Sequence, residues 1–129
     1  MLHTVNDYLN QAEHNRGLAD FLRDSKVDCL DWAVTCLFYS AVHYVNAYLR
    51  KNNITIPRRH KGDQRGPGRT NIVQQDPALS FIYASYRHLN DESSDARYEL
   101  KKINAADYDK FLVTQLDKIE AYIIPKVSS

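Results

Sequence analysis

The 129-residue chain has few of the residues and motifs that define several special protein classes. Its two cysteines, Cys29 and Cys36, lie in one apolar, helix-like run, where seven residues span roughly 10 Å along a helix axis, too far for a disulfide between them. It has no Cys-x-x-Cys and no His-Glu-x-x-His motif, and Asn6 and Asp7 stand where a signal peptide would be apolar. These absences predict a reduced, cytoplasmic protein without a metal site or other cofactor.

An excess of charge of one sign is also missing. The chain has 17 lysines and arginines and 16 aspartates and glutamates, which gives a formal net charge of +1. Proteins that coat nucleic acid indiscriminately need a general excess of cations. Any attraction for phosphate must therefore be local, and we expect it to be modest and sensitive to salt.

A long uninterrupted apolar run is absent as well. Residues 28–50 are long and apolar enough to be mistaken for a membrane span, but polar side chains recur in them every three or four positions. The polar positions are Asp28, Asp31, Thr35, Tyr39, His43, Asn46 and Arg50. They form a polar stripe on one face, which predicts the central helix of a soluble bundle.

Apolar residues follow helical spacing elsewhere, and no run alternates with period two for long enough to require a strand. We predict helices at about residues 4–24, 27–51, 76–91 and 104–123, with Thr4 and Asp76 as N-caps and Pro125 as the end of the last. Residues 93–100 read as a short turn or a brief helix, and residues 52–75 as a basic loop. The chain is expected to form one all-α domain, 1–129, folded as a four- to five-helix up-down bundle.

The positive charge that the chain does have is concentrated in IPRRHKGDQRGPGRT, residues 56–70. Its five cations are Arg58, Arg59, Lys61, Arg65 and Arg69. Asp63 is the one acid, and His60 lies among the arginines. Histidine suits proton transfer near neutral pH, and arginine suits bidentate binding of phosphate. The stretch is either a phosphate site or a solvated connector between helices.

The chain resembles the HEPN superfamily of small helical bundles over about residues 5–122. The resemblance rests on FYSAVH (38–43) in an Ala-rich second helix, on the loop with histidine and arginine, and on a later Y..L...S..ARY pattern. The residues of that pattern are Tyr86, Leu89, Ser93, Ala96, Arg97 and Tyr98. The resemblance implies a HEPN-like bundle, commonly a homodimer, that binds RNA in a toxin or antiphage defence context.

Many members of that superfamily are metal-independent endoribonucleases with an arginine, four to six residues and then a histidine. None of the five histidines of this chain follows an arginine at that spacing. Three functions therefore stay open. One is an RNA-binding effector that cleaves RNA through a variant site, and the alternative is a non-catalytic HEPN-like module that binds a nucleotide or a partner protein encoded nearby. The third is a helical bundle of purely structural use. No membrane partner is expected.

The candidate site follows from the loop and from the resemblance. The catalytic candidates are His60, Arg65 and His43, with His60 as the acid/base. The phosphate-binding candidates are Arg58, Arg59, Lys61, Arg69 and Arg97. Two other interpretations stay open: His43 is a core histidine with satisfied hydrogen bonds, or Arg97 forms an ion pair with Asp28 or Asp31.

Overall fold

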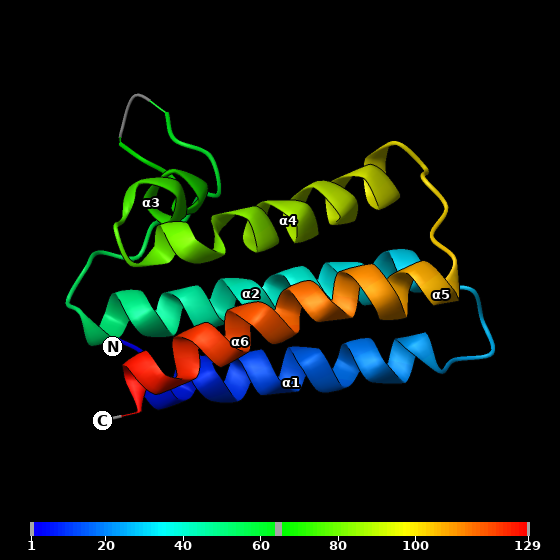
Figure 1. Ribbon diagram of the computed structural model, residues 1–129, viewed down its shortest axis with the longest axis horizontal. Coiled ribbons are helices and arrows are strands. Elements are labelled where there is room, and N and C mark those ends of the chain that lie inside the picture. Colours follow the sequence, from blue (N-terminus) through cyan, green and yellow to red (C-terminus); the bar gives the residue numbers. More distant parts are fainter. Residues whose placement is uncertain (1, 64–65, 129) are drawn as a thin grey trace.

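A computed structural model describes residues 2–63 and 66–128, which are mostly helical and contain no β-strand. Four long helices, α1 (Val5–Arg23), α2 (Leu30–Lys51), α4 (Tyr83–Tyr98) and α6 (Val113–Val127), run alternately up and down (Figure 1). Helix α2 contacts the other three, so the predicted central helix is confirmed. Within the described ranges, no helix combines the length and the apolarity needed to cross a bilayer.

Helices α1 and α2 pack closely because small side chains meet between them. Ala12 and Ala19 of α1 are fully buried, and the Ser40 hydroxyl of α2 donates a hydrogen bond of 2.8 Å to the Ala12 carbonyl. The predicted cap of α1 is confirmed: the Thr4 hydroxyl accepts from the Asp7 amide, and the Asp7 carboxylate accepts from the Thr4 amide. These local bonds satisfy amides that the first helical turn leaves free.

Ion pairs fasten α1 to the C-terminal part of the chain. The Arg16 guanidinium binds both Asp117 and Glu120 of α6. Arg23 forms a two-pronged pair with Asp109, with both nitrogen–oxygen distances at 2.8 Å. Side chains of the first and last helices therefore meet although about a hundred residues separate them in the sequence.

The predicted third helix has different bounds in the structure. The Asp76 carboxylate does accept from the amides of Ala78 and Leu79, but the turn that it caps is the short 3-10 helix η1 (Leu79–Ile82). Helix α4 then continues to Tyr98, well past the predicted end at residue 91. Residues 93–98 extend this helix because Leu89, Ser93 and Ala96 keep one face buried. Of the two interpretations of 93–100, the helical one holds for 93–98, as part of α4 and not as a separate helix.

The last predicted helix is divided into three pieces. It begins with α5 (Ala105–Asp107), passes through the π-helical turn η2 (Tyr108–Leu112) and continues as α6. The prediction that Pro125 ends it was wrong, since α6 runs to Val127. Proline at position 125 has no N–H to donate to the carbonyl four residues earlier, but only two helical residues follow it, so little of α6 depends on that bond.

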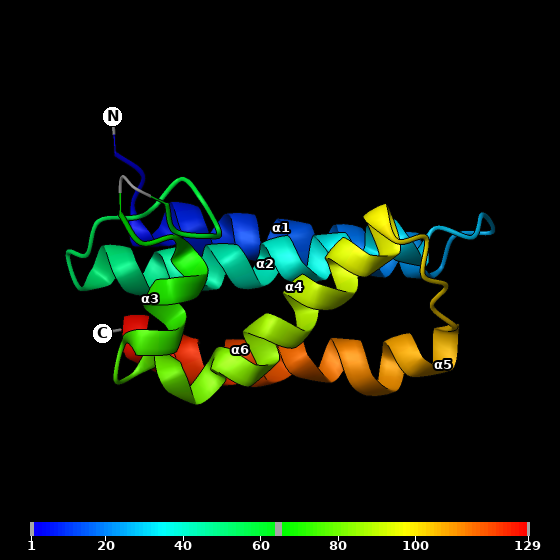
Figure 2. The same ribbon diagram turned by 90° about the horizontal axis from the view of Figure 1, so that it is seen from above.

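The basic loop is shorter than predicted because helix α3 (Arg69–Gln75) begins inside residues 52–75. The loop and α3 lie at the end of the bundle where α2 ends and α4 begins (Figures 1 and 2). The chain connections between α1 and α2 and between α4 and α5 lie at the opposite end. The basic loop and α3 are therefore at one end of the bundle, and the two other connections are at the opposite end.

Candidate anion-binding site at the basic loop

The basic loop folds back on itself and is held by backbone hydrogen bonds. The amides of Arg69 and Thr70 donate to the carbonyls of Arg59 and His60, both at 2.8 Å. The Asn71 side-chain oxygen accepts from the amides of Gly62 and Gly68 at 2.9 and 3.0 Å. These hydrogen bonds close the described part of the loop into a compact turn.

Glycine is required at position 68 because two segments of the loop backbone come into contact there. A Cβ atom at this position would lie 2.3 Å from the Lys61 carbonyl carbon and 2.6 Å from the His60 carbonyl oxygen. Gly66 has φ of 140°, a backbone conformation that side chains disfavour. The glycines therefore allow the return of the chain that brings Arg69 next to His60.

Arg69 is the centre of this structure, and its side chain points inward. It is 6% exposed. Its Nε donates to the Asn46 side-chain oxygen at 3.0 Å, its Nη2 donates to the Pro57 carbonyl at 2.7 Å, and its Nη1 lies 3.0 Å from His60 Nδ1. Arg69 was predicted to bind phosphate; in the structure, three of its donors hold the loop against α2.

The buried Arg69 charge has no acidic partner among the residues that the structure describes. Its hydrogen-bond acceptors are an amide oxygen, a backbone carbonyl and an imidazole nitrogen, all of them neutral groups. A buried charge is normally compensated by an opposite charge, because removing it from water costs several kcal/mol. Neutral acceptors offset part of this cost and leave the positive charge in place.

His60 is half-buried between Arg69 and two aromatic rings of α2. Its ring centroid lies 5.2 Å from that of Phe38 and 5.9 Å from that of Tyr39. Because arginine has no acceptor, the contact with Arg69 requires a lone pair on His60 Nδ1, so the proton of the neutral ring sits on Nε2. Burial lowers the pKa of His60, and the charges of Arg69 and Arg97 lower it further.

Beside the loop lies a cavity of about 710 Å³, here called the loop cavity. It is bounded by the N-terminal segment, α1, the end of α2 and the loop. Its lining residues are Leu2, His3, Tyr8, Arg50, Ile54, Thr55, Ile56, Pro57, Arg58 and Arg69. None of these described lining residues is acidic. The loop cavity therefore combines three arginines with aliphatic and aromatic surface.

A second cavity, of about 520 Å³, adjoins the first and is here called the histidine cavity. Its lining residues are His3, Asp7, Tyr8, Asn10, Gln11, His14 and His43. The two cavities share His3 and Tyr8. Despite the three histidines, the described part of the chain contains no group of metal-ligating side chains with suitable geometry.

His43 lies in the wall of the histidine cavity. Its ring stacks on Tyr8, with centroids 6.2 Å apart and planes 23° from parallel. Its Nδ1 atom is buried and has no hydrogen-bond partner among the described protein atoms. Burial lowers the pKa of His43, and the charges of Arg69 and His3 act in the same direction.

The other candidates differ in their surroundings. Arg58 is exposed and lines the loop cavity, and Lys61 is exposed on the loop. Arg59 is half-buried and pairs with Asp63 at 3.2 Å. Arg97 donates from Nε to the Ser93 carbonyl at 3.1 Å and stacks on Tyr98, and no ion pair with Asp28 or Asp31 is seen. Arg65 lies outside the described residues.

Sequence reasoning missed the residues that complete the site. Asn46 was recognised as part of the polar stripe, but its role as the acceptor for Arg69 depends on a contact across 23 residues. Asn71, Tyr8 and Arg50 were not predicted. Arg50 could have been predicted as a site residue, because it is a cation in the last turn of α2, next to the loop. The packing of Tyr8 against His43 has no local sequence signal.

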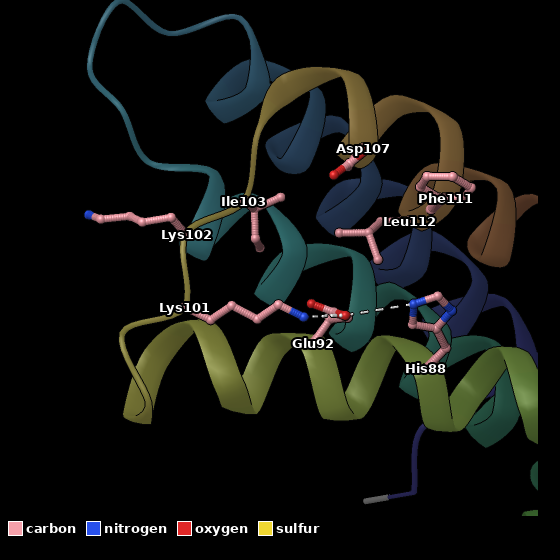
Figure 3. A pocket seen from close by; sticks show the side chains of 8 residues that line it. All are labelled: His88, Glu92, Lys101, Lys102, Ile103, Asp107, Phe111 and Leu112. Atoms are coloured by element: carbon pink, nitrogen blue, oxygen red, sulfur yellow. Dashed lines mark hydrogen bonds and ion pairs between the residues drawn. The ribbon is translucent and has the colours of Figure 1, made fainter.

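A third cavity, of about 240 Å³, lies at the opposite end of the bundle (Figure 3). It is lined by His88, Glu92, Lys101, Lys102, Ile103, Asp107, Phe111 and Leu112. Glu92 lies between Lys101 and His88, with its carboxylate 2.8 Å from Lys101 Nζ and 3.8 Å from His88 Nε2. Here the charge of Lys101 is compensated within the protein.

No protein-family model matches the chain, and searches of curated proteins and of solved structures find no match. The HEPN resemblance of the sequence therefore stays a prediction.

Proposed function

We propose that the chain is a HEPN-like bundle that binds RNA, with RNA phosphate held in the loop cavity. The observation that carries the proposal is Arg69, a buried arginine that lines this cavity and has no acidic partner among the described residues. A guanidinium has five N–H donors; Asn46, Pro57 and His60 take three of those of Arg69, and the Tyr86 side chain also contacts this group. An incoming phosphate would supply the missing negative charge and accept from the remaining donors.

Two further arginines support the same interpretation. Arg58 projects from the loop and Arg50 from the last turn of α2, and both line the loop cavity. With no acidic side chain in the described lining, their charges add to that of Arg69. A cavity lined by one sign of charge concentrates ions of the opposite sign, even in a chain with a net charge of only +1.

The size and the apolar lining of the cavity favour a nucleic acid over a free inorganic anion. About 710 Å³ is within the range of cavities that bind small organic ligands and is far more than one phosphate needs. Ile54 and Ile56 offer apolar surface, and Tyr8 offers an aromatic ring. These groups suit the ribose and base of a nucleotide unit.

His60 is not proposed as a catalytic acid or base. A base that removes a proton from a ribose hydroxyl needs a free lone pair facing the substrate. In neutral His60 the lone pair on Nδ1 is taken by Arg69, and the other nitrogen already carries the proton. His60 is better suited to positioning Arg69 and to donating a hydrogen bond from Nε2.

The test measures binding of a fluorescently labelled single-stranded RNA by anisotropy, in EDTA and over a range of salt concentrations. We expect Arg50→Ala/Arg58→Ala to weaken binding and to reduce the slope of log affinity against log salt by about 1.4, since each phosphate contact contributes about 0.7 for single strands. The RNA should remain intact. A matched control is Lys102→Ala/Lys118→Ala, which removes the same charge from two exposed lysines away from the loop.

The control should bind RNA as the parent protein does. Equal affinities and slopes for both double variants would contradict the proposal. Cleavage of the RNA in EDTA that disappears in His60→Ala would restore the catalytic interpretation of His60.

A further inference from the structure

The structure places two cavities of different charge next to each other, with Tyr8 in the wall of both. The loop cavity has no acidic side chain in its described lining. The histidine cavity contains Asp7, and hydrogen bonds from Thr4 lower the pKa of the Asp7 carboxyl group, so this group is ionised at neutral pH. Phosphate is attracted to the first cavity and repelled from the second.

The polar groups of the histidine cavity suit a different part of a nucleotide. Asn10 and His14 present hydrogen-bond donors and acceptors, and Asp7 presents acceptors only. Base edges carry both kinds of group, including amino groups that donate to a carboxylate. The histidine cavity therefore has the chemistry to bind a base edge but not a phosphate.

Tyr8 joins the two cavities and is held in a defined orientation. His43 stacks on its ring from inside the bundle, and the His3 ring lies edge-on with centroids 5.8 Å apart and planes 78° from parallel. The side chain of His3 is 71% exposed, so this neighbour is displaced at little cost. Proteins that bind single strands use such fixed aromatic rings for base stacking.

We propose that Tyr8 is the stacking platform for an unpaired nucleobase, which enters the histidine cavity while its phosphate lies in the loop cavity. This inference rests on the proposed function and adds to it the class of ligand. The ligand is RNA with an unpaired base, because a base inside a duplex has its faces stacked and its pairing edge occupied. Tyr8 then determines the specificity for single strands, and the arginines supply most of the salt-dependent attraction.

The test compares Tyr8→Leu, Tyr8→Phe and Phe111→Leu with the parent protein. Tyr8 packs partly against the core, and leucine retains apolar contact while removing the flat ring. Phenylalanine keeps the ring and removes only the hydroxyl group. Phe111→Leu is the matched control, because it removes a partly exposed ring from the cavity at the opposite end (Figure 3). Thermal unfolding of each variant verifies that it is folded.

The ligands are a labelled single-stranded RNA, the duplex of the same sequence and a single strand carrying 2-aminopurine, whose fluorescence falls on stacking. We expect the parent protein to prefer the single strand to the duplex by about 10-fold, and Tyr8→Leu to lose about 10-fold in single-strand affinity with an unchanged salt slope. Tyr8→Phe and Phe111→Leu should stay close to the parent. The 2-aminopurine fluorescence should fall with the parent and not with Tyr8→Leu.

The outcomes separate this inference from the proposed function. If Arg50→Ala/Arg58→Ala weakens binding while Tyr8→Leu matches the parent in affinity and in 2-aminopurine fluorescence, the stacking platform is refuted and the phosphate site stands. Equal affinity of the parent for single strand and duplex refutes the platform as well. If the parent protein binds no RNA at low salt, both proposals fail.

Discussion

The cavities at the two ends of the bundle both contain cations, but they differ in what neutralises those cations. At the end shown in Figure 3, Glu92 accepts a hydrogen bond from Lys101 that raises the pKa of that lysine, and it also faces His88. At the loop end, Arg69 is more deeply buried than Lys101 and has only neutral acceptors among the described residues. From this difference we expect local compensation, more than the number of cations, to decide which end attracts an anion.

The largest effect is expected from removing the buried charge. Arg69→Met keeps a side chain of similar length but leaves the Asn46 oxygen, the Pro57 carbonyl and His60 Nδ1 without their donor. At about 1 kcal/mol or more for each buried acceptor, the free energy of unfolding should fall by about 3 kcal/mol, measured by urea denaturation. Lys101→Met at the opposite end is the control, with an expected loss below about 1 kcal/mol because its ion pair is partly exposed. Equal losses would contradict the contrast between the ends.

A smaller effect is expected from giving the loop cavity the acid that it lacks. Thr55 is exposed and lines the cavity with Arg50 and Arg58, so Thr55→Glu supplies the kind of compensation that Glu92 supplies at the other end. We expect RNA affinity at low salt to fall by about 10-fold, and the difference from the parent to shrink as salt screens the added charge. Thr55→Gln has nearly the same shape without the charge. An identical loss in both variants would mean that shape, and not charge, governs binding.

The smallest effect concerns pH. Burial, Arg69 and Arg97 lower the pKa of His60 below its ordinary value of 6.5, so the unfolded chain binds this proton more tightly than the folded chain does. The contribution of His60 to stability is therefore complete above pH 6.5 and is lost as the pH falls through the folded pKa. We expect a lower free energy of unfolding at pH 5.5 than at pH 7.5, and a smaller difference in His60→Gln. An unchanged pH dependence in that variant would refute the assignment to His60.

The bundle was predictable because helix formation depends on near neighbours in the sequence. Apolar spacing located the long helices, and the Thr4 cap and the polar stripe of α2 were read correctly. The bounds of α4 and α6 were predicted wrongly. At these helix ends, burial against other helices outweighs the helix propensity of single residues and the effect of a proline. Ser93 and Ala96 continue α4 since the core covers that face, and Pro125 is tolerated in α6.

Local spacing and composition are enough to predict an all-helical chain with one strongly basic stretch. Which of the basic residues turn inward depends on contacts between distant segments. Arg69 is buried because Asn46, 23 residues earlier, and the Pro57 carbonyl converge on it, and because Gly68 lets the loop close without a side chain. Such convergence depends on distances between distant segments, which no local pattern encodes. The packing of Tyr8 against His43, which joins α1 to α2 at the edge of the site, was decided in the same way.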